Sequence, residues 1–145
     1  MPRFKTGNLF KVPGLKVVTA NSSLTKDGRL VMGRGAAGDL KLKVPGIDKI
    51  FGKMIQETCG HLGLYGLLMC GIYGAAQVTY DFRDKADLDL IAFSMAFLAD
   101  EAETNRYICH INYPGIGNGR LSKEEVKPLL DILPDNVYVW ERLEY

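Results

Sequence analysis

Short apolar runs alternate along the chain with stretches in which apolar residues recur at helical spacing. The run Leu15–Ala20 is rich in β-branched residues and lies between turn residues, so it predicts a buried strand. The same reasoning predicts further strands near 66–72 and 75–80, over 106–113 and over 137–140. The expected strands are therefore spread along the whole chain.

Helices are expected between these strands. Apolar residues at positions 47, 50, 51, 54 and 55 predict a helix over 47–59, and a shorter helix is expected after the glycine-rich stretch 33–38. Ser122 and Glu125 have the S-x-x-E spacing of a capping box, which predicts a helix that runs to about residue 130. Asp84 is expected to cap another helix, whose apolar stripe consists of Leu88, Ile91, Met95 and Leu98.

Alternating strands and helices are typical of α/β proteins. We therefore expect a single α/β domain over residues 1–145, with three α/β/α layers around a mixed, largely parallel sheet. The charge-free run 62–80 is long enough to cross a bilayer, but glycines interrupt it at 63, 66, 71 and 74. Two buried strands joined by a turn explain this run better, so no membrane association is expected.

The composition is that of an ordinary globular protein, with 47% apolar and 24% charged residues. The 18 Lys and Arg residues nearly balance the 17 Asp and Glu residues, which gives a net charge of +1. Because nucleic-acid binders usually carry a basic excess or a basic stripe, no polynucleotide partner is expected. The lysines at 41, 43, 49 and 53 are expected to form a solvated helix face rather than a phosphate-binding patch.

Three scattered cysteines and two histidines lack the spacing of a zinc site, so no metal and no cofactor is expected. They are Cys59, Cys70, Cys109, His61 and His110. The cysteines are better explained as buried free thiols in a reducing compartment. The first ten residues, MPRFKTGNLF, contain no apolar stretch of the kind found in secretory signals. A cytoplasmic protein is therefore expected.

Two glycine-rich loops follow strand-like segments, with the sequences GRGAAG at 33–38 and PGIGNG at 114–119. Glycine lets main-chain N–H groups approach a ligand closely, and such groups at a turn or helix start bind anions. In parallel sheets, ligands bind at the loops that follow the carboxyl ends of strands. Two such loops in one small domain predict a ligand that carries two adjacent phosphates.

Two alternatives remain open for these loops. The first loop matches the G-x-G-x-x-G pattern of dinucleotide-binding units at Gly33, Gly35 and Gly38. The apolar piece 30–32 before it is, however, shorter than the strand that such a unit requires. Either loop taken alone is also compatible with a tight chain reversal that binds no ligand.

Three segments together resemble the macro domain family. Residues 18–22 (VTANS) are similar to the family's strand-end motif, residues 32–37 (MGRGAA) to its first phosphate loop, and residues 114–119 (PGIGNG) to its second loop. Their order and spacing also agree, over nearly the whole chain. The resemblance implies a macro-type fold that binds ADP-ribose or a closely related nucleotide diphosphate, either free or attached to a protein.

The resemblance also implies roles for individual residues. Asn21 would approach the distal ribose, where the family uses the matching asparagine to orient the ribose or a nearby water. Asn8 stands where the family has an aspartate that accepts from the adenine amino group, and it keeps an acceptor oxygen. In the first loop, main-chain N–H groups would be offered to the phosphates and distal ribose by Gly33, Arg34, Gly35 and Ala36. In the second loop, the diphosphate would be wrapped by Gly115, Ile116, Gly117, Asn118 and Gly119.

Other residues near these loops have alternative interpretations. Tyr113 would either stack on a ligand ring or fill space beside Pro114. Asp81 and Arg83 would either reach the ligand or form a solvated ion pair. His110 lies within an apolar strand and is expected to be a hydrogen-bonded core histidine.

The sequence departs from the catalytic pattern of the family it resembles. The family's hydrolases use a lysine after a central strand and an acid in the second loop, whereas residues 77–83 contain no lysine and the loop has Asn118. Binding without turnover is therefore the first hypothesis. A phosphatase acting on ADP-ribose 1″-phosphate is the alternative, because that reaction needs mainly a positioned phosphate and a bound water. An ADP-ribosyl hydrolase is a third hypothesis, and a protein that recognises ADP-ribosylated partners is a fourth.

Overall fold

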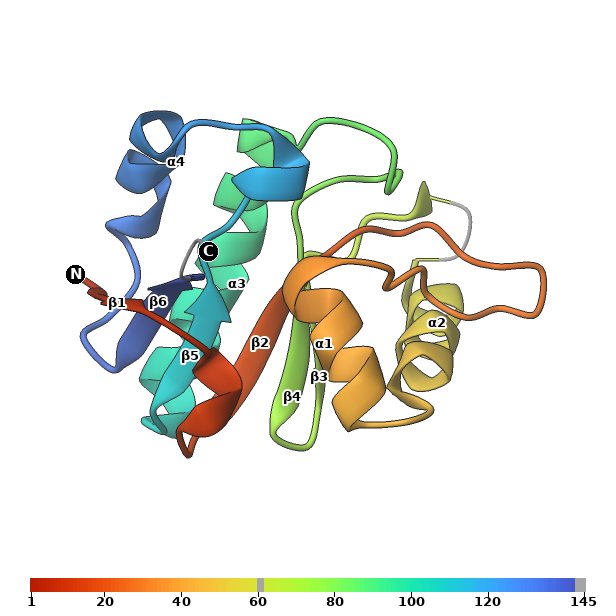
Figure 1. The fold of residues 1–145 in the computed structure, drawn as a ribbon, viewed down its shortest axis with the longest axis horizontal. Helices are drawn as coiled ribbons and strands as arrows, with labels where there is room; N and C mark the ends of the chain where they lie inside the picture. Colours follow the sequence, from red (N-terminus) through yellow and green to blue (C-terminus); the bar gives the residue numbers. More distant parts are fainter. Residues whose placement is uncertain (60–61, 143–145) are drawn as a thin grey trace.

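The computed structural model describes residues 1–59 and 62–142, and these residues form a six-stranded sheet (Figure 1). Its spatial order is β1-β6-β5-β2-β4-β3. Only β3 runs antiparallel to its neighbour among the described strand pairs. The strands are β1 (Arg3–Thr6), β2 (Leu15–Ala20), β3 (Leu67–Cys70), β4 (Tyr73–Gln77), β5 (Cys109–Asn112) and β6 (Val137–Glu141). The expected mixed, largely parallel sheet is confirmed.

Helices cover both faces of the sheet (Figure 1). Helices α1 (Gly35–Lys43) and α2 (Ile47–Thr58) pack on one face, and α3 (Leu88–Asn105) and α4 (Lys123–Leu130) pack on the other. Two short 3₁₀ turns, η1 (Leu9–Lys11) and η3 (Gly117–Gly119), lie in the connections. The expected three-layer α/β/α arrangement is thus confirmed.

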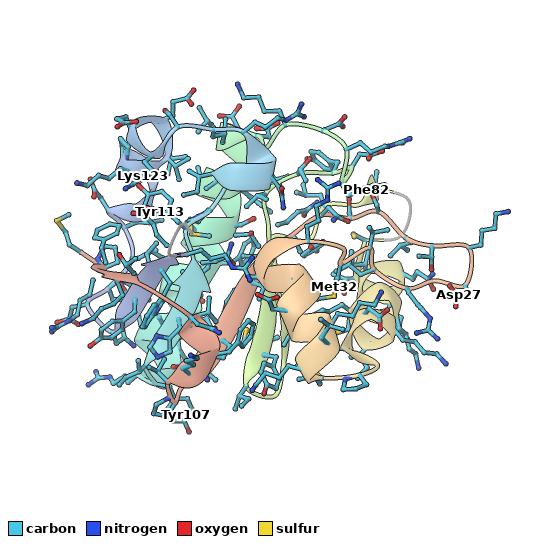
Figure 2. All side chains as sticks on the ribbon, in the orientation of Figure 1. Asp27, Met32, Phe82, Tyr107, Tyr113 and Lys123 are labelled. Atoms are coloured by element: carbon cyan, nitrogen blue, oxygen red, sulfur yellow. The ribbon has the colours of Figure 1, made fainter. Side chains whose placement is uncertain are left out.

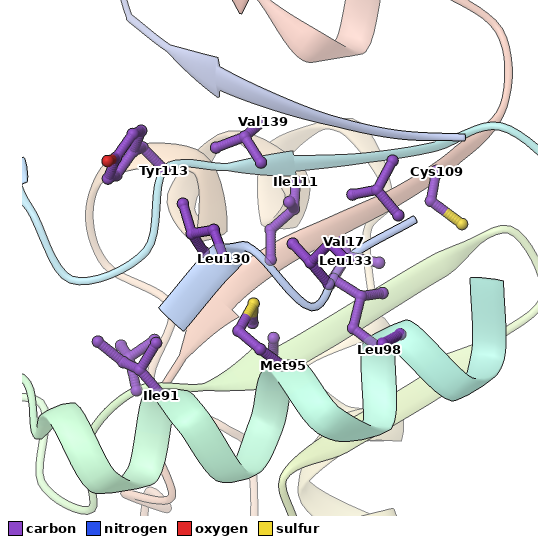
Figure 3. Packing of buried hydrophobic residues seen from close by; sticks show 14 of the residues in the cluster. Val17, Ile91, Met95, Leu98, Cys109, Ile111, Tyr113, Leu130, Leu133 and Val139 are labelled. Atoms are coloured by element: carbon purple, nitrogen blue, oxygen red, sulfur yellow. The ribbon is translucent and has the colours of Figure 1, made fainter. Parts of the chain in front are cut away.

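The sheet divides the core into two clusters because successive side chains of a strand point to opposite faces. In the larger cluster, Ile91, Met95 and Leu98 of α3 pack against strand residues such as Val17 and Ile111 (Figure 3). In the other cluster, the buried side chains of α1 and α2 pack against β2 and its neighbours; they include Leu40, Ile47, Phe51 and Ile55. Fully burying one such side chain contributes about 1.5–3 kcal/mol.

The ends of several elements follow the sequence prediction closely. Strand β2 has the expected bounds. Helix α4 begins with the expected capping box, in which Glu125 N donates to Ser122 Oγ and Ser122 N donates to a Glu125 carboxylate oxygen. The charge-free run 62–80 contains β3 and β4, as expected. Within the described part of the chain, the structure has no helix with the length and hydropathy of a membrane span.

The expected cap of α3 was wrong. Asp87, not Asp84, caps this helix, because Asp87 Oδ1 accepts from the N–H groups of Asp89 (2.9 Å) and Leu90 (3.2 Å). Asp84 lies in the preceding turn, where its N–H donates to the Asp81 carbonyl. Both aspartates precede the apolar stripe, so composition alone did not separate them.

The boundaries of β4 and β5 also differ from the prediction, and one strand was not predicted. Strand β4 begins at Tyr73 and ends at Gln77, before the predicted end at residue 80, and β5 is shorter than the predicted 106–113. The reason at β5 is that α3 continues to Asn105 and ends at Arg106, which has a left-handed φ of 61°. Strand β1 was not predicted, because all of its residues are exposed and it has no apolar pattern.

Candidate functional site

The connections of the sheet diverge between β2 and β5. From β2 the chain passes through α1, α2 and β3 to β4, on one side, whereas from β5 it passes through α4 to β6, on the other side. In open α/β sheets, the crevice outside the carboxyl ends of such a strand pair is where ligands bind. Both glycine-rich loops belong to these two connections, so the topology brings them to the same edge of the sheet.

Hydrogen bonds between Thr19 and Asn112 link β2 and β5 beyond the point where their backbone pairing ends. Their backbone register ends at Val17 and Ile111, although β2 remains paired with β4 as far as Ala20. Beyond that point the Thr19 N–H donates to Asn112 Oδ1 (2.9 Å), and Asn112 Nδ2 donates to Thr19 Oγ1 (2.8 Å). Asn112 was not predicted to have a role, because the only signal for it was an amide near the end of a predicted strand.

The first glycine loop leads directly into α1. Gly35 is the first helical residue, with φ of 60°, and the first main-chain bond of the helix runs from Gly38 N to Arg34 O (3.1 Å). Arg34 is the N-cap residue and makes no side-chain capping bond. The N–H groups of the first turn therefore have no intrahelical partner, and with the helix dipole they favour an anion. Gly33 and Arg34 are exposed in front of them.

The second glycine loop packs against the core at Gly115 and is open to solvent at Gly117. Gly115 has φ of 76° and is buried, and a methyl group there would lie 2.7 Å from Ile91 and 2.9 Å from Leu121. Gly117 has φ of 66° and nothing within 4 Å of the position of a methyl group. The main-chain N–H groups of residues 116–118 donate to no other residue in the described part of the chain. This loop thus offers several N–H groups in an open turn.

The two loops face each other. A methyl group on Gly35 would lie 3.7 Å from Asn118 Nδ2, so the start of α1 and the tip of the second loop are neighbours. The exposed Asn118 side chain belongs to η3, which lies beyond the end of β5 in Figure 1. Unpaired N–H groups of two loops therefore lie close together at this edge of the sheet, an arrangement suited to a polyphosphate.

Asn21 lies immediately after β2, at the same edge, and is 9% exposed. Its Oδ1 accepts from Ser23 N (2.8 Å), and its Nδ2 donates to Val31 O (3.0 Å). Each side-chain group keeps a second hydrogen-bonding position, one N–H and one lone pair. The side chain is therefore fixed by the loop that it closes and still has the capacity to bind a ligand.

Asn8 and Tyr113 differ in their availability to a ligand. Asn8 is exposed after β1, where its Oδ1 accepts from Phe10 N (2.9 Å). Tyr113 is 4% exposed and lies at one end of the larger core cluster (Figure 3), with its hydroxyl donating to Lys123 O (3.1 Å). The burial of Tyr113 favours the space-filling interpretation, and stacking of its ring on a ligand stays a prediction.

Asp81 and Arg83 form a bidentate ion pair in the loop after β4, with bonds of 3.0 and 2.7 Å. Hydrogen bonds from Arg83 lower the pKa of Asp81 to about 2, so this carboxyl group stays ionised at neutral pH. Arg120, which follows η3, donates to the Arg83 carbonyl (3.2 Å) and joins this loop to the second glycine loop. Phe82, labelled in Figure 2, is 54% exposed at this edge, opposite Tyr107. The solvated ion pair is thus confirmed.

His110 is a core histidine, as predicted. It is 4% exposed, its Nε2 lies 2.9 Å from the Pro13 carbonyl, and its Nδ1 accepts from Trp140 Nε1 (2.9 Å). These partners require the neutral tautomer with a proton on Nε2. Burial lowers the pKa of His110, although the bond to Pro13 acts in the opposite direction.

This lowered pKa makes the stability of the chain pH-dependent. Unfolded histidine titrates near 6.5, so as the pH falls below that value the unfolded state binds a proton before the folded state does. We expect the free energy of unfolding to fall with pH until the folded pKa is reached. Urea titrations at pH 7.5 and 5.5 measure the effect, and His110→Gln is the control because it keeps every other titratable group. An equal pH dependence in both chains would contradict this prediction.

The remaining candidate groups are the metal-ligand residue types, the cysteines and the helix lysines. Residues 1–59 and 62–142 contain no group of three His, Cys, Asp or Glu side chains that could hold a metal ion, and His61 lies outside these residues. The cysteines at 59, 70 and 109 are free thiols. The lysines at 41, 43, 49 and 53 are exposed, as predicted, and Lys41 Nζ lies 3.9 Å from the buried Asp48 carboxylate.

Neither a protein-family model nor a curated protein matches the sequence. Solved structures do match it. The macrodomain of Thermus aquaticus DarG shares 22% identity with a TM-score of 0.74, and that of Mycobacterium tuberculosis DarG shares 20% with 0.75, each match covering 99% of both chains. Thermosipho africanus DarTG, solved in complex with ADP-ribose, shares 16% with 0.73 over 99% of this chain and 42% of its own.

These matches define the class of fold. The α/β/α sandwich of this chain matches these macrodomains over nearly its whole length. The chain therefore has the macrodomain fold, in agreement with the motifs at 18–22, 32–37 and 114–119.

Proposed function

We propose that this chain binds ADP-ribose, with the diphosphate held between the two glycine loops. The observation that carries the proposal is the proximity of Gly35 to Asn118, because it brings the unpaired N–H groups of both loops close together. Successive main-chain N–H groups in turns form anion-binding sites, and two neighbouring loops of this kind suit a ligand with two adjacent phosphates. The ADP-ribose complex of Thermosipho africanus DarTG, which has the same fold, supports the choice of ligand.

The rest of the ligand would extend to both sides of the diphosphate. The distal ribose would lie near Asn21 and the start of α1, and the adenine would lie toward Asn8 at the end of β1. Asn8 Oδ1 has a second lone pair beside the one used by Phe10 N, so it can accept from the adenine amino group. The proposed main-chain donors are Gly33, Arg34, Gly35, Ala36, Gly115, Ile116, Gly117 and Asn118. The N–H of Gly119 already donates to the Ile116 carbonyl (3.4 Å), so Gly119 would contact the diphosphate without donating to it.

We further propose that the site binds without turnover. A general acid needs a proton to give, and the low pKa of Asp81 leaves its carboxyl group ionised beside Arg83. The second loop has the amide Asn118 at its tip, which exchanges no proton at neutral pH. Free ADP-ribose and ADP-ribose attached to a protein are both compatible with such a binding site.

Calorimetric titration tests the proposal, with AMP and NAD as control ligands. We expect tight binding of ADP-ribose and weaker binding of AMP, which lacks the diphosphate. At a free concentration of 100 times Kd, ADP-ribose should stabilise the fold by about 2.7 kcal/mol. Absence of both heat and thermal stabilisation would contradict the proposal. Release of phosphate from ADP-ribose 1″-phosphate would instead assign the phosphatase alternative.

A further inference from the structure

A fully buried glutamine organises the turn that precedes β3. Gln77, at the end of β4, accepts through Oε1 from Tyr65 N (2.9 Å) and Gly66 N (3.2 Å). Its Nε2 donates to the Gly63 carbonyl (2.6 Å), and its own carbonyl accepts from Ser94 Oγ (2.6 Å). Every polar group of this buried side chain is therefore engaged, which fixes residues 63–66 relative to the sheet.

Tyr65 links this turn to the proposed ligand site by a hydrogen bond. Its hydroxyl donates to the main-chain carbonyl of Asn21 (2.6 Å), and the residue is 7% exposed in the core cluster that includes α1 and α2. Burial raises the pKa of Tyr65 far above its ordinary value, so the hydroxyl keeps its proton and remains a donor. This bond holds the main chain of Asn21, whereas the bonds to Ser23 and Val31 hold its side chain.

Asn21 in turn fixes the approach to the first glycine loop. Its side chain bonds Ser23 N and Val31 O, which closes the loop between them. Val31 is followed by Met32, which is 2% exposed, and by Gly33, where the glycine loop begins. Hydrogen bonds thus link Gln77 to Tyr65, Tyr65 to Asn21 and Asn21 to Val31. Val31 lies two residues before the glycine loop that would contact the distal ribose.

We propose that Tyr65 is a positioning residue that sets the preference for ADP-ribose over ADP. This inference rests on the proposed function, because it concerns the distal-ribose end of the same site. ADP has the adenosine and the diphosphate but no distal ribose, so its affinity does not depend on the exact position of Asn21. ADP-ribose affinity does, since a small displacement of a positioned polar group weakens its hydrogen bonds to the ligand.

The test compares two tyrosine-to-phenylalanine variants, each titrated with ADP-ribose and with ADP. Tyr65→Phe should weaken ADP-ribose binding about tenfold and change ADP binding less than about twofold. Tyr113→Phe is the matched control, because it also removes a hydroxyl that donates to a main-chain carbonyl from a buried position. It lies in the other core cluster and should leave both affinities unchanged. Thermal midpoints of both variants measure any purely structural effect.

A second comparison tests whether Tyr65 acts through Asn21. Asn21→Ala should lose the same preference for ADP-ribose over ADP, and the double variant should lose no more, since both residues act through one path. An unchanged ratio of the two affinities in Tyr65→Phe, or an equal loss for both ligands, would overturn the inference. Wild-type chain that binds neither ligand would instead overturn the proposed function.

Discussion

Replacing Gly117 by valine should weaken ADP-ribose binding at least 100-fold, which corresponds to about 3 kcal/mol. The position of a methyl group at Gly117 meets nothing within 4 Å, so the side chain would enter the open space beside the unpaired N–H groups of the second loop. That space is where the diphosphate is proposed to lie. Isothermal titration calorimetry measures the loss, and Gly35→Val should show it as well.

Gly71→Val is the control for this experiment. Gly71 has φ of 62°, close to the 66° of Gly117, and it also has nothing within 4 Å of a methyl position. It lies between β3 and β4, at the amino end of β4 and hence at the edge of the sheet away from the glycine loops. Both variants therefore bear a similar cost of a left-handed φ, but only Gly117→Val should lose the ligand. Equal affinities in the two variants would refute the diphosphate site.

Gly52→Ala should destabilise the fold by about 3 kcal/mol or more, although alanine in place of glycine normally stabilises a helix by about 1 kcal/mol. Gly52 is in the middle of α2, where the helix lies directly on the turn at Gly28. A methyl group at Gly52 would overlap the Gly28 carbonyl oxygen and lie 3.1 Å from the Arg29 Cα. Main-chain atoms cannot move aside as a flexible side chain can, so the helix and the turn must separate.

Urea unfolding measures this effect, and Lys49→Ala on the exposed face of the same helix is the control. Lys49→Ala should change the free energy of unfolding by less than about 0.5 kcal/mol. A stabilised Gly52→Ala variant would show that helix propensity dominates and that α2 does not contact the turn. The turn lies between Asn21 and the first glycine loop, so this variant should also bind ADP-ribose less tightly.

The parts of the fold that sequence predicted well are those specified by local chemistry. Strand β2 is a β-branched run between turn residues, and the capping box of α4 is complete within four residues. Both glycine loops were predicted because the residue type itself indicates them: glycine adopts positive φ values and lets main-chain N–H groups approach a ligand. Their placement at one edge followed from the alternation of strands and helices, which also predicted the largely parallel sheet.

The parts that sequence did not predict depend on contacts between distant residues. Tyr65 and Asn21 are 44 positions apart, and Asn112 and Thr19 are 93 apart, so no local pattern indicates that they share hydrogen bonds. Tyr113 had two plausible roles, and the contact with α4 that favours space filling depends on packing that no local pattern indicates. Strand β1 pairs with β6 at the far end of the chain and has no buried residue of its own.

That exposed edge strand has a consequence for the energetics of the site. Strand β1 buries none of its four residues and is held by its pairing with β6, which closes a loop of most of the chain. Segments with little burial open at a small fraction of the free energy of global unfolding. Asn8 follows this strand directly, so the adenine end of the proposed site lies on one of the least protected segments of the sheet. The free energy of binding there must include the cost of keeping β1 paired with β6. A bound nucleotide would therefore slow hydrogen exchange along this edge of the sheet.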